Sequence, residues 1–237
     1  MEGFLIFLKG CYKLPGQNVD IGFVYSLATS ESKKTAVKQL IRFLQNWGFA
    51  LINVYASKDI DGEEYIDATS AVEAKLNNPE QLDYVSFMLA EMYYGMLIVN
   101  SGFLGQIIQG IQITQYEDDE KANGCYCISM SIQGEQIIPG CDLMFSERYS
   151  QTTNDFINAV TDKLVSFMKA FYQYSNYSYA FCDAEAAMEC TPEALATQHN
   201  EVYSVAVVPE KQGDGTVFDV RKSSWNIDGF SQRYEPV

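Results

Sequence analysis

The chain has 237 residues, of which 47% are hydrophobic and 14% aromatic, and this composition excludes general disorder and allows a sizeable core. Its formal net charge is −15, and a surface of that sign repels nucleic acid and anionic lipid while it attracts basic protein surfaces. We therefore expect a folded protein that binds neither nucleic acid nor membranes.

The charge is divided unevenly along the chain. Residues 1–58 carry a net charge of +4, residues 59–120 carry −12 and residues 121–237 carry −7. In the middle third, thirteen acids stand against Lys75 alone. Such a field acts over a Debye length of about 8–10 Å. The pattern predicts a basic protein surface as the partner.

The first elements are predicted to be the two strands of a hairpin. Apolar runs at 4–11 and 19–27 flank the turn-forming residues 15–18, which is typical of a β-hairpin with a longer loop. The first run has no basic region before it and no small-residue cleavage site after it. We therefore interpret it as a strand and not as a signal peptide.

A helix is predicted to follow, with Ser30 as its N-cap and Gly48 as its C′ residue. Its apolar face recurs at helical spacing, at Val37, Leu40, Ile41, Leu44 and Trp47. The opposite face carries bases, as a solvated face does: Lys33, Lys34, Lys38 and Arg42. Phe49–Tyr55 is the next predicted strand.

The acidic third is predicted to contain a loop and two helices. The loop covers residues 59–64, and a short helix at 70–76 has a capping-box pattern. Asn78 and Pro79 open the second helix, whose apolar stripe is Leu82, Val85, Met88, Leu89 and Met92 and which Gly95 is expected to end. The apolar stretch 96–113 contains too many amides for a membrane span and is expected to form a turn and a buried strand.

The second half of the chain again alternates strands and helices. Strands are predicted at 106–116 and 125–133, joined by the acidic connection 117–124 with a turn at Asn123-Gly124. A long helix at 153–174 and a strand at 177–185 follow. Thr191-Pro192 is the expected start of another helix, and the last strand pair is predicted at 202–208 and 216–220.

These elements predict an α+β fold with a largely antiparallel sheet and amphipathic helices packed on one face. We expect a single domain over residues 1–237, because no Pro- or Ser-rich linker divides the chain. A hairpin–helix–strand order occurs within 3–56 and again within 106–185. This order suggests two related halves, 1–100 and 101–237.

Motifs for metal or cofactor chemistry are weak. A calcium loop starting at Asp59 would need a glycine where Glu64 stands and an acid where Ser70 stands. Cys125 and Cys127 share one face of a strand, but the second pair of zinc ligands is missing, and core packing explains them better. Neither a dinucleotide fingerprint nor a P-loop is present. The sequence predicts no metal and no cofactor.

Nucleophilic catalysis has little support either. His199 is the only histidine, so a Cys182 or Cys190 nucleophile would depend on it, with Asp183 as a third partner, and no local signature surrounds them. The six cysteines without a secretory signal indicate reduced thiols in a cytoplasm. We expect a cytoplasmic protein that is not an enzyme.

Two segments lead to a resemblance. They are VDIGFVYSL at 19–27, before the first helix, and YSYAFCDAE at 177–185, before Thr191-Pro192. With these segments the chain resembles the cytoplasmic immunity proteins of bacterial polymorphic toxin systems. The resemblance implies that the protein binds and blocks one cognate toxin, which is often a nuclease or another enzyme with a basic cleft. An acidic surface would speed the encounter with such a partner.

The expected contact residues are the acids of two segments in the middle third. They are Asp59, Asp61, Glu63, Glu64 and Asp67, together with Glu117, Asp118, Asp119 and Glu120. Two alternatives stay open: a hydrolase whose carboxylates come together only in three dimensions, and a scaffold that forms homo-oligomers through its aromatic surface.

Overall fold

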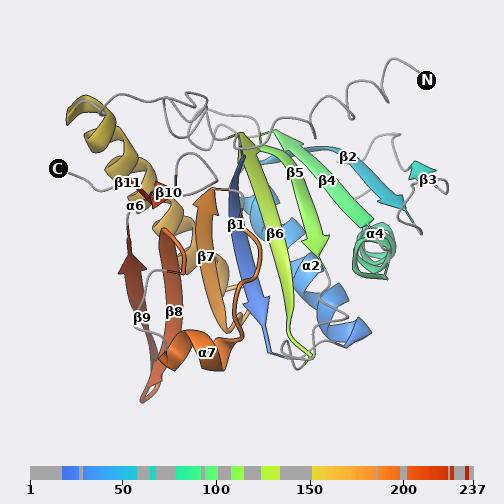
Figure 1. Ribbon diagram of the computed structural model, residues 1–237. Helices are drawn as coiled ribbons and strands as arrows, with labels where there is room; N and C mark the ends of the chain where they lie inside the picture. Colours follow the sequence, from blue (N-terminus) through green and yellow to red (C-terminus); the bar gives the residue numbers. More distant parts are fainter. Residues whose placement is uncertain are drawn as a thin grey trace.

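The computed structural model describes residues 18–26, 29–57, 65–67, 78–91, 94–100, 108–114, 124–133, 151–184, 186–197, 202–223, 225–226 and 233–234. Within them, nine strands form one antiparallel sheet in the order β3-β2-β4-β5-β6-β1-β7-β8-β9 (Figure 1). Its strands are β1 (Asn18–Tyr25), β2 (Ala50–Ser57), β3 (Tyr65–Asp67), β4 (Tyr94–Asn100), β5 (Ile108–Thr114), β6 (Tyr126–Gln133), β7 (Tyr179–Ala184), β8 (Val205–Gln212) and β9 (Gly215–Lys222). A separate pair is formed by β10 (Trp225–Asn226) and β11 (Arg233–Tyr234).

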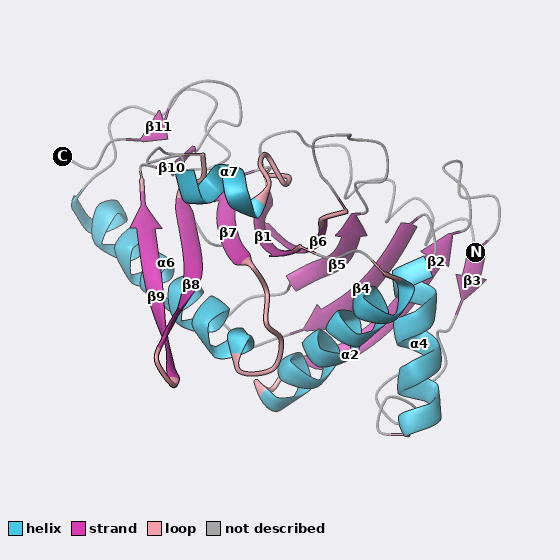
Figure 2. Ribbon diagram, turned by 90° about the horizontal axis from the view of Figure 1, so that it is seen from below, coloured by secondary structure: helices cyan, strands magenta, loops and turns pink. Residues whose placement is uncertain are grey.

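The three longer helices lie on one side of this sheet (Figure 2). They are α2 (Ser30–Asn46), α4 (Pro79–Glu91) and α6 (Gln151–Tyr172). Their buried side chains form one core with alternate residues of β1, such as Ile21 and Phe23. The predicted α+β class, with an antiparallel sheet and amphipathic helices on one face, is confirmed.

A shorter helix, α7 (Pro192–Thr197), lies on the opposite side of the sheet (Figure 2). Leu195 from this helix joins Val24, Tyr179 and Phe181 in a second, smaller core. Arg221 of β9 donates from Nη1 to the Leu195 carbonyl oxygen at 2.7 Å. The central strands β1 and β7 are therefore covered on both faces, which the sequence pattern did not indicate.

Local sequence signals explain most helix ends. Thr29, and not the predicted Ser30, is the N-cap of α2, since its side chain accepts from the Ser32 backbone N–H. Gly48 follows the helix with φ +83°, as predicted for a C′ glycine. Asn78 caps α4 as predicted, because its Oδ1 accepts from the Glu80 N–H at 2.9 Å. Gly95, predicted to end that helix, lies instead in β4, where it pairs with Ala56.

The predicted elements of the second half appear as α6, β7, α7 and the β8–β9 hairpin, with β5 and β6 paired directly. The predicted strand at 4–11 and the short helix at 70–76 lie outside the described residues. The single domain and its two related halves stay predictions. Among the described residues, none of the helices has both the length and the apolar character needed to cross a membrane.

Candidate functional site

The strands that precede the two acidic segments, β2 and β5, end on the same side of the sheet. Strands β2 and β5 each pair antiparallel with β4, so they run in the same direction and end on the same side. Ser57, the last residue of β2, pairs with Tyr94, and continuing the β4–β5 register by two residues places Thr114, the last residue of β5, opposite the same tyrosine. The two strand ends are separated by two strand spacings, roughly 10 Å.

The start of β6 and the end of β1, in the middle of the sheet, lie on the same side. Thr114 pairs with Cys127 of β6, and Tyr126 pairs with Tyr25 at the end of β1. We call the side of the sheet at which Ser57, Thr114, Tyr126 and Tyr25 lie the loop edge. It is the side from which the chain leaves toward residues 58–64 and toward residues 115–123.

Of the nine predicted contact residues, Asp67 is in a described strand, β3, where it pairs with Tyr55. The other eight lie outside the described residues: Asp59, Asp61, Glu63, Glu64, Glu117, Asp118, Asp119 and Glu120. Their role in binding a partner stays a prediction. The structure adds the position of the strand ends that precede them.

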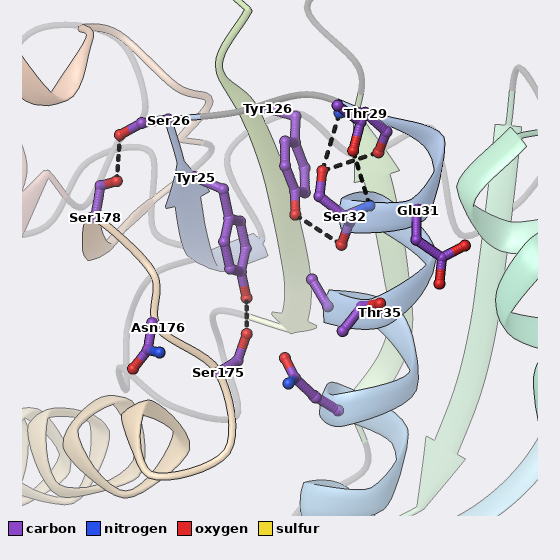
Figure 3. Close-up of a pocket in the computed structure, with 12 residues that line it drawn as sticks. Tyr25, Ser26, Thr29, Glu31, Ser32, Thr35, Tyr126, Ser175, Asn176 and Ser178 are labelled. Atoms are coloured by element: carbon purple, nitrogen blue, oxygen red, sulfur yellow. Dashed lines mark hydrogen bonds between the residues drawn. The ribbon is translucent and has the colours of Figure 1, made fainter.

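A pocket of about 580 Å³ opens at the loop edge (Figure 3). Four segments line it: the end of β1, the first turns of α2 that follow it, the start of β6 and the turn between α6 and β7. Eight of its twelve lining residues within the described part of the chain carry a hydroxyl group: Tyr25, Ser26, Thr29, Ser32, Thr35, Tyr126, Ser175 and Ser178. The pocket therefore presents hydroxyl groups beside a larger apolar surface.

Two stacked tyrosines form the inner wall of this pocket. The rings of Tyr25 and Tyr126 are 4.7 Å apart at an interplanar angle of 9°. The Tyr25 hydroxyl is hydrogen-bonded to the Ser175 Oγ at 2.9 Å, and the Tyr126 hydroxyl donates to the Ser32 carbonyl oxygen at 3.1 Å. Burial raises the pKa of Tyr126 to about 12 and raises the pKa of Tyr25 as well. Both phenols are therefore neutral near pH 7, and their bonds connect the sheet to α2 and to the α6–β7 turn.

The N-terminus of α2 is capped by its own side chains. Thr29 Oγ1 accepts from the Ser32 N–H at 3.1 Å, and Ser32 Oγ accepts from the Thr29 N–H at 2.9 Å. Ser32 Oγ also donates to the Thr29 carbonyl oxygen at 2.8 Å. This capping box satisfies N–H groups that would otherwise attract an anion. Glu31, exposed in the first turn of the helix, brings a carboxylate to the same place.

The far wall is fixed to β1. Ser178 donates its backbone N–H to the Val24 carbonyl oxygen at 2.7 Å, and its hydroxyl lies 2.5 Å from the Ser26 Oγ. Because both walls are hydrogen-bonded to the sheet, the pocket is preformed.

Two of the residues considered for nucleophilic catalysis, Cys182 and Asp183, are buried. Cys182 is fully buried in the main core, and desolvation raises the pKa of its thiol well above the usual value. Asp183 is buried and accepts from the Ser204 N–H at 2.9 Å and from the Ser204 hydroxyl at 2.5 Å. Its carboxylate therefore has a structural partner. His199 lies outside the described residues.

The cysteine pair proposed above as core packing is buried in the second core. Cys125 and Cys127 are 3% and 1% exposed. Burial raises the pKa of both thiols, which keeps them neutral. In the part of the chain that the structure describes, no group of three or more His, Cys, Asp or Glu side chains could hold a metal ion.

Sequence reasoning missed the pocket because its parts meet only through strand pairing. Tyr25 and Tyr126 become neighbours through the β1–β6 register, and Ser175 reaches them from the end of α6. The one local signal was the run of hydroxyl residues at the start of α2. Such a run is typical of a helix cap, so it does not by itself indicate a pocket.

The fold and this site define an α+β protein with one broad antiparallel sheet and a preformed, hydroxyl-lined pocket at its loop edge. The family model described as Immunity protein 64 matches residues 16–233. The chain belongs to this family. The predicted resemblance to bacterial immunity proteins is thereby confirmed. Comparisons with curated proteins and with solved structures gave no match.

Proposed function

We propose that this protein is a cytoplasmic immunity protein that binds one cognate toxin and neutralises it. The observation that carries the proposal is the family match, which covers almost the whole chain. The protein acts by binding and not by catalysis, in agreement with the burial of Cys182 and with the structural partner of Asp183.

The proposed contact surface is the loop edge with its acidic segments. Residues 59–120 carry a net charge of −12, and the strand ends before both acidic segments lie about 10 Å apart. That separation is close to one Debye length at physiological salt. The two segments would therefore act on an approaching partner as one field, which favours a toxin with a basic cleft.

The first experiment is capture of the partner. The purified protein is incubated with lysate of its own source at low and at high salt, and the retained proteins are identified by mass spectrometry. We expect one basic protein that is lost as the salt concentration rises. The captured protein is then expressed in a test host with and without this chain, and growth is measured.

Rescue of growth by this chain supports the proposal. A captured protein that is not toxic, or whose toxicity this chain does not reduce, contradicts it. The contact residues are tested separately, by reversing Asp61 and Glu63 in one segment and Asp118 and Asp119 in the other. If rescue and its salt dependence stay the same after all four reversals, the acidic segments are not the contact surface.

A further inference from the structure

We infer that the edge strand β9 pairs with the β9 strand of a second copy of this chain, which makes a weak, two-fold symmetric dimer. The inference goes beyond the proposed function, because it concerns a surface away from the loop edge. Strand β9 is the last of the nine strands of the sheet, with β8 on its inner side (Figure 1). Among the described residues, no strand pairs with its outer side.

Strand β9 has few of the features that protect sheet edges from a second strand. It pairs with β8 over eight residues without a register shift and contains no proline. The strand at the other edge, β3, has three residues. Short edge strands, bulges and prolines are the usual protection, and no residue of β9 is buried. The edge at β9 is therefore long and regular enough to pair with another strand.

The hydrogen bonds to β8 fix which backbone groups of β9 point outward. Ser223, the residue after the strand, donates its N–H to the Ser204 carbonyl oxygen at 2.9 Å. Along an antiparallel pair, residues point their N–H and C=O groups alternately toward the neighbouring strand and away from it. Counted back from Ser223 along the unshifted register, the groups of Phe218, Val220 and Lys222 point away from β8. A second strand must pair through these residues.

Charge selects one of the registers that this alternation allows. A dimer centred on Asp219 or on Arg221 would place two like charges opposite each other, which is destabilising. A dimer centred on Phe218 would place Asp219 opposite Val217 of the second copy. A dimer centred on Val220 places Asp219 of each copy opposite Arg221 of the other. We therefore assign the two-fold axis to Val220.

The charges of β9 are already arranged for this pairing. Arg221 Nε donates to Asp219 Oδ2 at 2.8 Å within the strand, and their side chains are 32% and 41% exposed. In the dimer the four charges alternate in sign across the axis, so the bond within each strand does not have to break. Charged residues protect an edge when like charges meet. Here opposite charges lie two residues apart, so antiparallel pairing makes them attract.

The β8–β9 hairpin is also a place where a chain of net charge −15 can meet its own copy. Residues 205–222 carry three acids and three bases, whereas residues 59–120 carry a net charge of −12. The six charged residues of the hairpin are Glu210, Asp214, Asp219, Lys211, Arg221 and Lys222. Electrostatic repulsion between the copies is therefore weak at this edge.

Sedimentation equilibrium of the full chain at physiological salt tests the dimer directly. One pair of strands is a small interface, so we expect a dissociation constant of roughly 0.1 mM. The mean mass should rise from near the monomer at about 10 µM toward the dimer at about 1 mM. A mass that stays monomeric at about 1 mM, or that grows beyond the dimer, overturns the inference.

Charge reversal tests the register. Asp219→Arg places two bases opposite each other, and Arg221→Asp places two acids opposite each other. Each variant alone should dimerise at least about tenfold more weakly than the natural chain. In an equimolar mixture each new charge meets its opposite, so a heterodimer should form again. Asp214→Arg, in the exposed turn of the hairpin, makes the same change in net charge and should leave dimerisation unchanged.

Circular dichroism shows whether these variants are folded, and amide hydrogen exchange of the natural chain needs no variant. The N–H groups of Phe218 and Val220 should exchange about two- to fourfold more slowly at about 1 mM than at about 50 µM, since pairing covers them. Those of Val217 and Asp219, which point toward β8, should not change. Equal exchange at both concentrations, or a mixture of variants that stays monomeric, contradicts the pairing.

The dimer and the proposed function fail separately. Strand β8 lies four strand spacings from β5, roughly 19 Å, and the two-fold axis turns the loop edges of the two copies in opposite directions. Monomeric variants should therefore rescue growth as well as the natural chain does. Loss of rescue in these variants would assign β9 to the toxin and overturn the inference. A dimer without any neutralised toxin would leave the pairing in place and remove the immunity function.

Discussion

One glycine leaves room for an aromatic ring of the neighbouring strand. Gly22 of β1 lies opposite Phe181 of β7, and a Cβ atom at this glycine would lie 2.2 Å from the Cε1 and Cζ atoms of that ring. Phe181 is fully buried and stacks on Tyr203 at 4.2 Å. The ring therefore has little room to move, and no other residue fits at position 22 without a shift of the second core.

We predict that Gly22→Ala lowers the free energy of unfolding by about 1–3 kcal/mol, the usual cost of overpacking a core. Urea denaturation measures this change. Gly215→Ala is the control, because the nearest atom to its new Cβ would be 3.7 Å away. Adding Phe181→Leu to Gly22→Ala should recover part of the loss, so that the double variant is more stable than the two single effects predict. Strictly additive effects would mean that the ring is not the obstacle.

The N-cap of α2 also depends on a single residue. Thr29 holds the capping box with Ser32, whereas the predicted cap, Ser30, is the first residue of the helix. Thr29→Ala should cost about 1 kcal/mol of unfolding free energy. Ser30→Ala should cost little, since alanine is a good helix former. Thermal unfolding of both variants decides between the two caps, and a larger loss for Ser30→Ala would contradict the assignment.

At the scale of elements, periodicity and capping residues located most helices and strands, but they could not predict which strands pair with each other. In α2 and α6, apolar residues recur every three or four positions because one face of each helix is buried. This periodicity made both helices predictable. Gly95 was misassigned because a glycine after a helix suits a C′ position and a strand equally well. Its pairing with Ala56 decides between them. The loop edge and its pocket depend on such pairings throughout, so the sequence could indicate acidic segments but not their common edge.

Helices α2 and α4 are joined by an ion pair with a defined pH dependence. The Asp83 carboxylate accepts from the Lys38 ammonium group. This bond, assisted by the charges of Lys38, Lys34 and Arg42, lowers the pKa of Asp83. A carboxyl group whose pKa is lower in the folded state stabilises the fold above its unfolded pKa, about 3.9. This contribution is lost as the pH falls through the lowered value.

We therefore expect Asp83→Asn to be less stable than the natural chain at pH 7, and the difference to shrink to zero as the pH falls below the lowered pKa of Asp83. Urea midpoints at several pH values measure it. Asp214→Asn, in the exposed turn between β8 and β9, removes the same charge without this ion pair. A difference that stays constant with pH would show that the carboxylate charge of Asp83 is not what joins the helices.

At the scale of the whole molecule, the uneven distribution of charge along the chain should matter more for association with a partner than the net charge. The chain is basic before residue 59 and strongly acidic from 59 to 120, and the sheet topology directs the two acidic segments to one edge. A partner would meet this concentrated field before it makes close contacts with the loop edge. Association rate and residence time should therefore depend on different residues, since steering acts on the former and close contacts on the latter.

This division can be measured once the toxin is in hand. Neutralising Asp59, Asp61, Glu63 and Glu64, or neutralising Glu117, Asp118, Asp119 and Glu120, removes four charges in each case. At low salt each set should slow association by about tenfold or more, and both sets together should multiply these effects, with dissociation little changed. Near 1 M salt, where the Debye length is about 3 Å, the rates should converge. Glu210→Gln with Asp214→Asn is the control, because both are exposed acids on the β8–β9 hairpin, and β8 lies four strand spacings from β5, roughly 19 Å. If the control slows association as much per charge removed, the net charge of the protein and not the two acidic segments steers the toxin.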